Sequence, residues 1–192
     1  DCENASPVLL GNASATLANL ARHGPSSVKM VDGGAVEALL GLCISTENLQ
    51  VLNNATMALA HLASHDSCLD KLVQKSVIAQ LLKLANACPH LSVGNAVILV
   101  LKRLALCNKA VPELVQRSSI TTVLRQLKKS GIDSDVARHV ADLLATLCKV
   151  SDPVGPAANR WLWRAGAESQ LLVAAWGNGG HLFERAISAA HL

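Results

Sequence analysis

The chain has 192 residues, of which 51% are hydrophobic and only 16% are charged, a composition typical of a folded protein with a sizeable core. Its net charge of +3 and its aromatic content of 2% argue against nucleic-acid binding, because there is little positive charge for phosphates and few rings for bases to stack on. No apolar run reaches the length of about 18 residues that indicates a membrane span.

Six cysteines occur, and none forms the CxxC pair that is typical of zinc sites and redox motifs. Cys43, Cys107 and Cys148 each follow a leucine near the end of a predicted helix, which indicates small core residues in a reducing compartment. We therefore predict a cytoplasmic protein without a metal site or cofactor. Glycosylation sequons at Asn12 and Asn54 fall inside predicted helices and are interpreted as chance matches.

An apolar pattern recurs along the chain with a period of about 42 residues. The sequence Leu-Ala-Asn-Leu-Ala at 17–21 returns as Leu-Ala-His-Leu-Ala at 59–63 and as Leu-Lys-Arg-Leu-Ala at 101–105. Two further columns of apolar positions keep the same period, so chance in a leucine-rich chain does not explain it. The chain is therefore predicted to consist of repeats, each of which buries an apolar face against its neighbours.

Three helices are predicted within each repeat. The second helix, at 35–43, follows a break at the Gly-Gly pair 33–34, and the long third helix, at 47–63, carries apolar residues at helical spacing. Side-chain oxygens of segment 45–47 are expected to cap the start of this long helix. The short first helix of the following repeat is predicted at 67–75.

A repeat of this length, with a glycine break between its two shorter helices and a long third helix, resembles the armadillo repeat. The segments at 29–40 and 55–63 are close to the signature of that family, and the resemblance covers about residues 8–192. It implies an all-α solenoid, a right-handed superhelix of three-helix repeats. HEAT repeats are the nearest alternative, but they have two helices and lack the glycine break.

In this reading the chain is one array over residues 1–192. Its parts are the end of a repeat at 1–33, full repeats at 34–75, 76–117 and 118–165, and a partial repeat at 166–192. Both ends would expose apolar repeat faces for further repeats or a partner to cover. Pro112 is expected to start a first helix, and the Pro/Gly segment at 151–156 to bend the array.

The resemblance also implies a groove, lined by the long helices, in which relatives hold an extended peptide with a column of asparagines. The equivalent column here matches only at Asn19, and the neighbouring column lacks the tryptophans of nuclear-import receptors, which argues against nuclear-localisation signals. The residues predicted to line the groove are Asn12, Asn19, Asn53, Asn54, Met57, His61, Asn95, Leu99, Arg103, Arg138, Asp142 and Thr146. Trp161 is either a further anchor for a partner or is packed under the insertion at 151–156.

The middle of the predicted groove favours an acidic partner segment. Arg103 offers a planar, permanently charged set of donors that suits a carboxylate, and His61 can take up a proton below about pH 6.5. Asp142 would repel acid one repeat further along the chain. We expect Arg103 to be exposed, so that replacing it with glutamate would leave the fold intact.

Two functions remain open from the sequence. The first is a protein-binding scaffold that recognises an extended or helical segment; the second is a structural subunit of a large cytoskeletal assembly such as the ciliary axoneme, since segment 21–25 resembles axonemal armadillo proteins. Catalysis is not expected, because no serine or cysteine has a base at recognisable spacing. The Gly-rich stretch at 177–180 lacks the residues of a phosphate loop, and His181 and Glu184 are unsupported as metal ligands.

Overall fold

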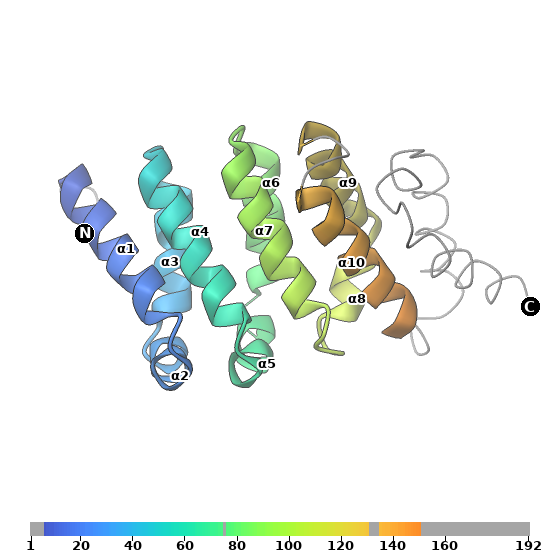
Figure 1. Ribbon diagram of the computed structural model, residues 1–192, viewed down its shortest axis with the longest axis horizontal. Coiled ribbons are helices and arrows are strands. Elements are labelled where there is room, and N and C mark those ends of the chain that lie inside the picture. Colours follow the sequence, from blue (N-terminus) through green and yellow to red (C-terminus); the bar gives the residue numbers. More distant parts are fainter. Residues whose placement is uncertain (1–5, 75, 131–134, 151–192) are drawn as a thin grey trace, which may run out of the picture. The chain divides into compact units, whose positions relative to one another are not determined.

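The computed structural model describes residues 6–74, 76–130 and 135–150, and within these ranges the regular structure is α-helix without a strand (Figure 1). This confirms the all-α prediction. The chain divides into two compact units, the first ending at Leu104 and the second beginning at Ala105. Trp161, the insertion at 151–156 and the partial repeat at 166–192 lie outside the described residues.

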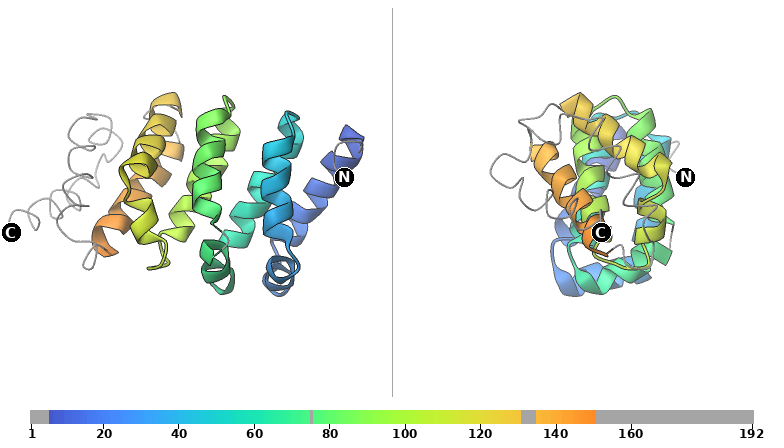
Figure 2. Two further views of the ribbon diagram at one scale, coloured as in Figure 1. Left: turned by 180° about the vertical axis from the view of Figure 1, so that it is seen from behind. Right: turned by 90° about the vertical axis from the view of Figure 1, so that its right-hand side faces the viewer.

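In the first unit, the helices follow the predicted order of short, second and long helix. They are α1 (Pro7–Leu20), α2 (Gly24–Asp32), α3 (Ala35–Ser45), α4 (Leu49–Ala63), α5 (Asp66–Gln74), α6 (Val77–Ala87) and α7 (Leu91–Leu104). The long helices α1, α4 and α7 pack side by side in one layer (Figure 1). Behind them, α3 and α6 form a second layer that faces the viewer in the left view of Figure 2.

The second unit repeats this order with a much shorter first helix. Its helices are α8 (Val111–Leu114), α9 (Arg117–Ser130) and α10 (Asp135–Val150), and α10 packs on both of the others. Pro112 lies in the first turn of α8, as the sequence predicts, where its missing N–H leaves no hydrogen bond unmade.

The glycine break between the first two helices is a left-handed turn. Gly34 has a φ of 84° and stands at the N-cap of α3, and Ser76, its equivalent in the next repeat, has a φ of 53° at the N-cap of α6. Glycine takes this conformation without a steric penalty, whereas serine does not. Ser118, the next equivalent, lies inside α9. In the second unit the break between the first two helices therefore falls at a different position of the repeat.

We expect the substitutions Gly34→Ala and Gly41→Ala to change stability in opposite directions. An added Cβ would contact nothing at either position, so backbone conformation alone decides the outcome. Gly34→Ala should destabilise by about 1 kcal/mol because its φ is left-handed. Gly41→Ala, in the interior of α3, should stabilise by about 0.5–1 kcal/mol through helix propensity. Urea unfolding of the two variants measures this, and a gain at position 34 would contradict the turn described here.

The long helix α4 begins two residues later than predicted, and its cap is a different residue. Asn48 is the N-cap, and its Oδ1 accepts from the backbone N–H groups of Gln50 at 2.9 Å and Val51 at 3.2 Å. The prediction that segment 45–47 supplies the cap is wrong, because Thr46 ends α3 and its hydroxyl accepts instead from the N–H of Asn48. Asparagine is among the strongest N-cap residues, which explains why Asn48 is the N-cap of α4.

Leucine columns of the repeat form the core. Leu59 and Leu101, which the sequence places at equivalent positions, are both fully buried. Cys43 and Cys107 are buried free thiols, as predicted, and burial raises the pKa of Cys43 to about 12, which keeps it protonated and unreactive. The side chain of Cys148 lies outside the described residues.

The outer side of α1 exposes positions that are buried one repeat later. Leu20 is 45% exposed, whereas its equivalents Leu62 and Leu104 are fully buried. Leu9 is exposed and its equivalent Val51 is buried. The same residue pattern thus lies in the core where a preceding long helix packs on it, and meets solvent on α1.

Candidate protein-binding face

The outward side chains of α1, α4 and α7 form what we call the long-helix face of the first unit, and they recur at the repeat period in three bands. The first band holds the amides Asn53 and Asn95, both partly buried. The second holds apolar side chains, among them Met57, which is 38% exposed, and Leu99, which is partly exposed. The third lies towards the carboxyl ends of the helices and holds Asn19, His61 and Arg103.

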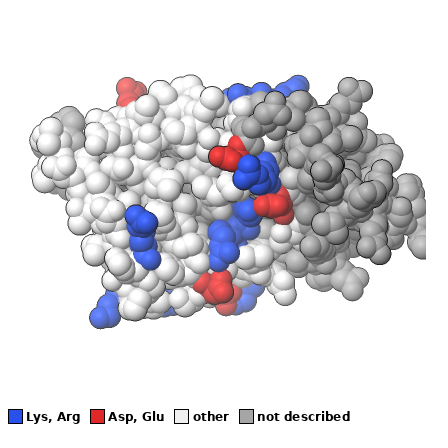
Figure 3. All heavy atoms as spheres, viewed as in Figure 1, with Lys and Arg blue, Asp and Glu red and all other residues white. Residues whose placement is uncertain are grey.

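The electrostatic character of this face follows from its sequence. The helices α1, α4 and α7 contain neither aspartate nor glutamate, and their charged residues are Lys102 and Arg103 near the carboxyl end of α7. Figure 3 shows the same side of the molecule, where uncharged atoms predominate over α1 and α4. These two cations also suit the negative end of the α7 helix dipole.

Asn54, predicted to meet a ligand, instead joins two long helices. Its Nδ2 donates to the carbonyl oxygen of Gly11 at 3.2 Å and to the hydroxyl of Ser14 at 3.3 Å, both on α1. Ser14 is fully buried and donates to the same Gly11 carbonyl. The Asn54 amide thus satisfies polar groups between α1 and α4, where buried polar groups require partners. Asn12, next to these residues on α1, is exposed.

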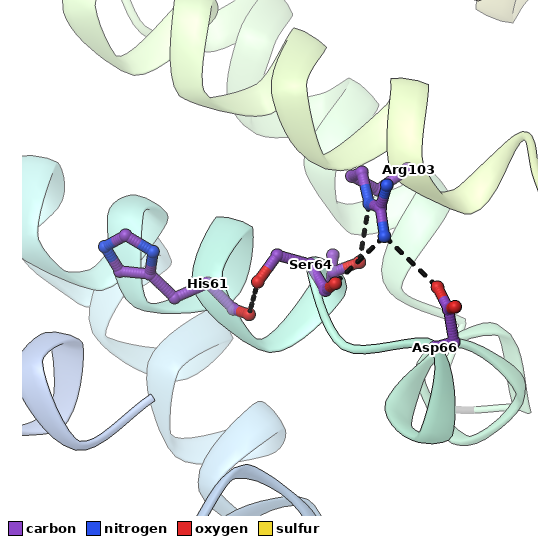
Figure 4. A network of polar contacts seen from close by, with 5 residues as sticks. His61, Ser64, Asp66 and Arg103 are labelled. Carbon is purple, nitrogen blue, oxygen red and sulfur yellow. Dashed lines mark hydrogen bonds and ion pairs between the residues drawn. The ribbon is translucent and has the colours of Figure 1, made fainter. Parts of the chain in front are cut away.

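Arg103 is also held by its own chain, across the boundary between two repeats. As Figure 4 shows, its side chain leaves α7 and reaches the carboxyl end of α4, where Nε donates to the Ala63 carbonyl at 3.3 Å and Nη2 to the Ser64 carbonyl at 2.9 Å. Nη2 also pairs with Asp66 Oδ1 at 3.1 Å. Arg103 is therefore only partly exposed, at 35%, and is bonded within its own chain, which differs from the exposed residue that the sequence predicts.

His65 makes the equivalent contact one repeat earlier. Its Nε2 lies 3.1 Å from the carbonyl oxygen of Ala21, the repeat equivalent of Ala63, so this nitrogen acts as the donor. In both repeats a side chain of the following repeat thus caps the carboxyl end of a long helix.

His61 is half-buried between these contacts, and its protonation differs from the expectation. Burial lowers its pKa from the ordinary value of 6.5, and the nearby Arg22 and His65 lower it further. His61 therefore remains neutral at pH values where an exposed histidine begins to take up a proton. At neutral pH it offers a partner a hydrogen-bonding imidazole ring without a charge.

The remaining predicted residues lie on α10 of the second unit. Arg138 and Asp142 are exposed and Thr146 is partly exposed. Arg138 pairs with Asp135 at 3.0 Å one turn away, and the Thr146 hydroxyl donates to the Asp142 carbonyl at 2.8 Å. The charges on this helix are mixed, in contrast to the long helices of the first unit.

In the described part of the chain, no group of three or more His, Cys, Asp or Glu side chains is placed to hold a metal ion. None of its helices is long and apolar enough to cross a membrane.

No family model and no curated protein matches the chain. Solved structures do match it. A designed armadillo repeat protein superposes with a TM-score of 0.73 at 20% identity, covering 94% of this chain and 78% of that one. Another, computationally designed for modular peptide recognition, gives 0.74 at 19% identity over 98% of this chain and 78% of that one. The chain has an armadillo repeat fold.

A third designed armadillo protein, solved in complex with the peptide (KR)4, superposes with a TM-score of 0.72 at 18% identity and covers 98% of this chain and 76% of that one. These structures give no support for the axonemal likeness or for a cytoskeletal location. Within the armadillo repeats, the sequence identifies the long-helix face but misses Ala63, Ser64 and Asp66 as partners of Arg103. No local signal marks these residues, because they meet Arg103 only when two repeats pack together.

Proposed function

We propose that the long-helix face of the first unit binds an extended segment of another protein, and that the protein is a non-enzymatic scaffold. The observation that carries this proposal is the recurrence of the bands on parallel long helices. Each repeat presents an outward apolar side chain, Met57 or Leu99, beside a partly buried amide, Asn53 or Asn95. Such a periodic surface suits a chain with its own regular spacing, and an amide can both donate to and accept from a peptide backbone.

Two of the similar structures favour the same mode of binding. One of those proteins was designed for modular peptide recognition, and another is in complex with (KR)4. For the present chain we propose a partner of the opposite charge, with acidic side chains near the carboxyl ends of the long helices. The long-helix face has no carboxylate on its own helices to attract lysine or arginine, and its charged groups are cations.

A pair of labelled octapeptides tests this proposal by fluorescence anisotropy at low ionic strength. We expect an octapeptide of alternating glutamate and alanine to bind the full chain, and (KR)4 to bind more weakly or not at all. Met57→Glu should weaken binding of the acidic peptide about tenfold, which corresponds to about 1.4 kcal/mol, because it adds a carboxylate to the exposed apolar band.

Lys128→Glu is the matched control, since Lys128 is exposed on α9 of the second unit, which is not one of the helices of the long-helix face, and the variant changes charge in the same direction. Stronger binding of (KR)4 than of the acidic peptide would show that the proposed partner has the wrong charge. Equal losses from the variants at positions 57 and 128 would show that binding is not located on the long-helix face.

A further inference from the structure

The Arg103 cation already holds a carboxylate of its own chain, that of Asp66. We propose that Asp66, the first residue of α5, acts as a built-in competitor beside the long-helix face, a carboxylate that an acidic group of the partner must replace at Arg103. This inference rests on the proposed function, because it identifies the residue that sets how strongly an acidic segment is bound. It assigns Arg103 as the anchor and Asp66 as the residue that tunes its specificity.

The position of the Arg103 guanidinium does not depend on Asp66. Nε and Nη2 donate to the carbonyl oxygens of Ala63 and Ser64, which belong to the last residues of α4 and its cap. These bonds orient the planar group from one side and use backbone atoms, which a change of side chain at position 66 leaves in place. The three bonds of Arg103 involve Nε and Nη2, while Nη1 carries two further N–H donors.

The ion pair itself is of the kind that exchanges readily. The Asp66 side chain is 87% exposed and that of Arg103 is 35% exposed. Solvent and salt screen such pairs, so their net contribution to stability is small. An external carboxylate therefore meets a cation that is held in position by backbone carbonyls and occupied by a weakly bound, solvent-exposed carboxylate.

The preceding repeat provides an internal comparison, because it lacks this pair. At the position equivalent to Arg103 it has His61, and at the position equivalent to Asp66 it has Gly24, next to the His65 ring. A carboxylate is thus absent from this turn where the long helix carries a histidine. It is present where the long helix carries the permanent cation.

Asp66 also begins α5, where a negative charge suits the helix dipole, so the test must separate competition from helix stabilisation. Asp66→Asn removes the charge and keeps a polar side chain of nearly the same size. We expect this variant to bind the glutamate–alanine octapeptide about threefold to fivefold more tightly than the wild type at low ionic strength, with the difference vanishing at high salt. The same substitution in an Arg103→Gln background should give no gain.

Glu47→Gln is the control for net charge, because it removes one exposed carboxylate just before the other end of α4. If Asp66→Asn binds no more tightly than the wild type, or gains as much in the Arg103→Gln background, the competitor is disproved while the proposed function stands.

A second measurement does not require the peptide to bind. In NMR spectra, the Arg103 Nε–H signal, assigned by its loss in Arg103→Gln, should respond to lower concentrations of sodium acetate in Asp66→Asn than in the wild type. If no variant binds the octapeptide, the proposed function fails and the acetate titration still decides the inference. Equal acetate responses in the two proteins would overturn it.

Discussion

Truncation of Leu62 to alanine is expected to lower the free energy of unfolding by about 2–5 kcal/mol, whereas Leu20→Ala should lower it by about 1 kcal/mol or less. The two residues occupy the same position of the repeat, but Leu62 is fully buried and Leu20 is 45% exposed. Removing Leu62 loses apolar burial and leaves a cavity between packed helices. Removing Leu20 takes away a side chain that already contacts solvent.

Urea unfolding followed by circular dichroism measures both variants, and Leu59→Ala and Leu101→Ala provide two further fully buried positions for comparison. Hydrogen exchange should show the loss from Leu62→Ala first in the amides of α4 and its neighbours, because repeats couple mainly to adjacent repeats. Equal losses for Leu20→Ala and Leu62→Ala would indicate that the outer side of α1 is covered in solution.

Charge reversal at Arg103 is expected to destabilise the fold as well as to weaken binding. Arg103→Glu removes the donors to the Ala63 and Ser64 carbonyls and places a second carboxylate near Asp66 at the carboxyl end of α4. Hydrogen bonds from charged groups contribute about 1.5–3 kcal/mol each when well shielded. Because Arg103 is about one-third exposed, we expect a total loss of about 2 kcal/mol.

The loss should be largest at low ionic strength and should be reduced in Arg103→Lys, which keeps the charge but not the planar set of donors. Lys102→Glu changes the neighbouring residue on α7 in the same way and serves as the matched comparison. If Arg103→Glu unfolds at the same urea concentration as the wild type, the bonds to the α4 carbonyls contribute nothing. Weaker binding by Arg103→Glu must therefore be interpreted with the measured loss of stability of the same variant.

Much of this fold could be predicted from the periodicity of the sequence. The repeated Leu-x-x-Leu-Ala segments place Leu59 and Leu101 at equivalent core positions, and both are buried. The glycine pair 33–34 predicts the break before α3, because a left-handed φ is a local property of the backbone. Helical periodicity also predicts which side of α4 and α7 faces outward, since apolar spacing along one helix reports its buried side.

The same periodicity could not distinguish Leu20 from Leu62, or a ligand-facing amide from a structural one. Leu20 and Leu62 are equivalent in sequence, and whether another long helix covers them is a property of the packed repeats. From the sequence alone, Asn54 and Arg103 are predicted to line the groove because their positions face outward. Only when α4 packs on α1 and α7 on α4 do the Gly11, Ala63 and Ser64 carbonyls come within hydrogen-bonding distance of them.

The sequence by itself determined the helices, their order and the buried columns of apolar residues. These features depend on local helix propensity and on the spacing of apolar residues within a single helix. The tertiary structure alone decided which polar side chains are engaged, because their partners lie about 40 residues away in the chain. It also decided the lowered pKa of His61, since burial and the neighbouring Arg22 and His65 set that value. Contacts between repeats therefore determine which outward residues are available to a partner.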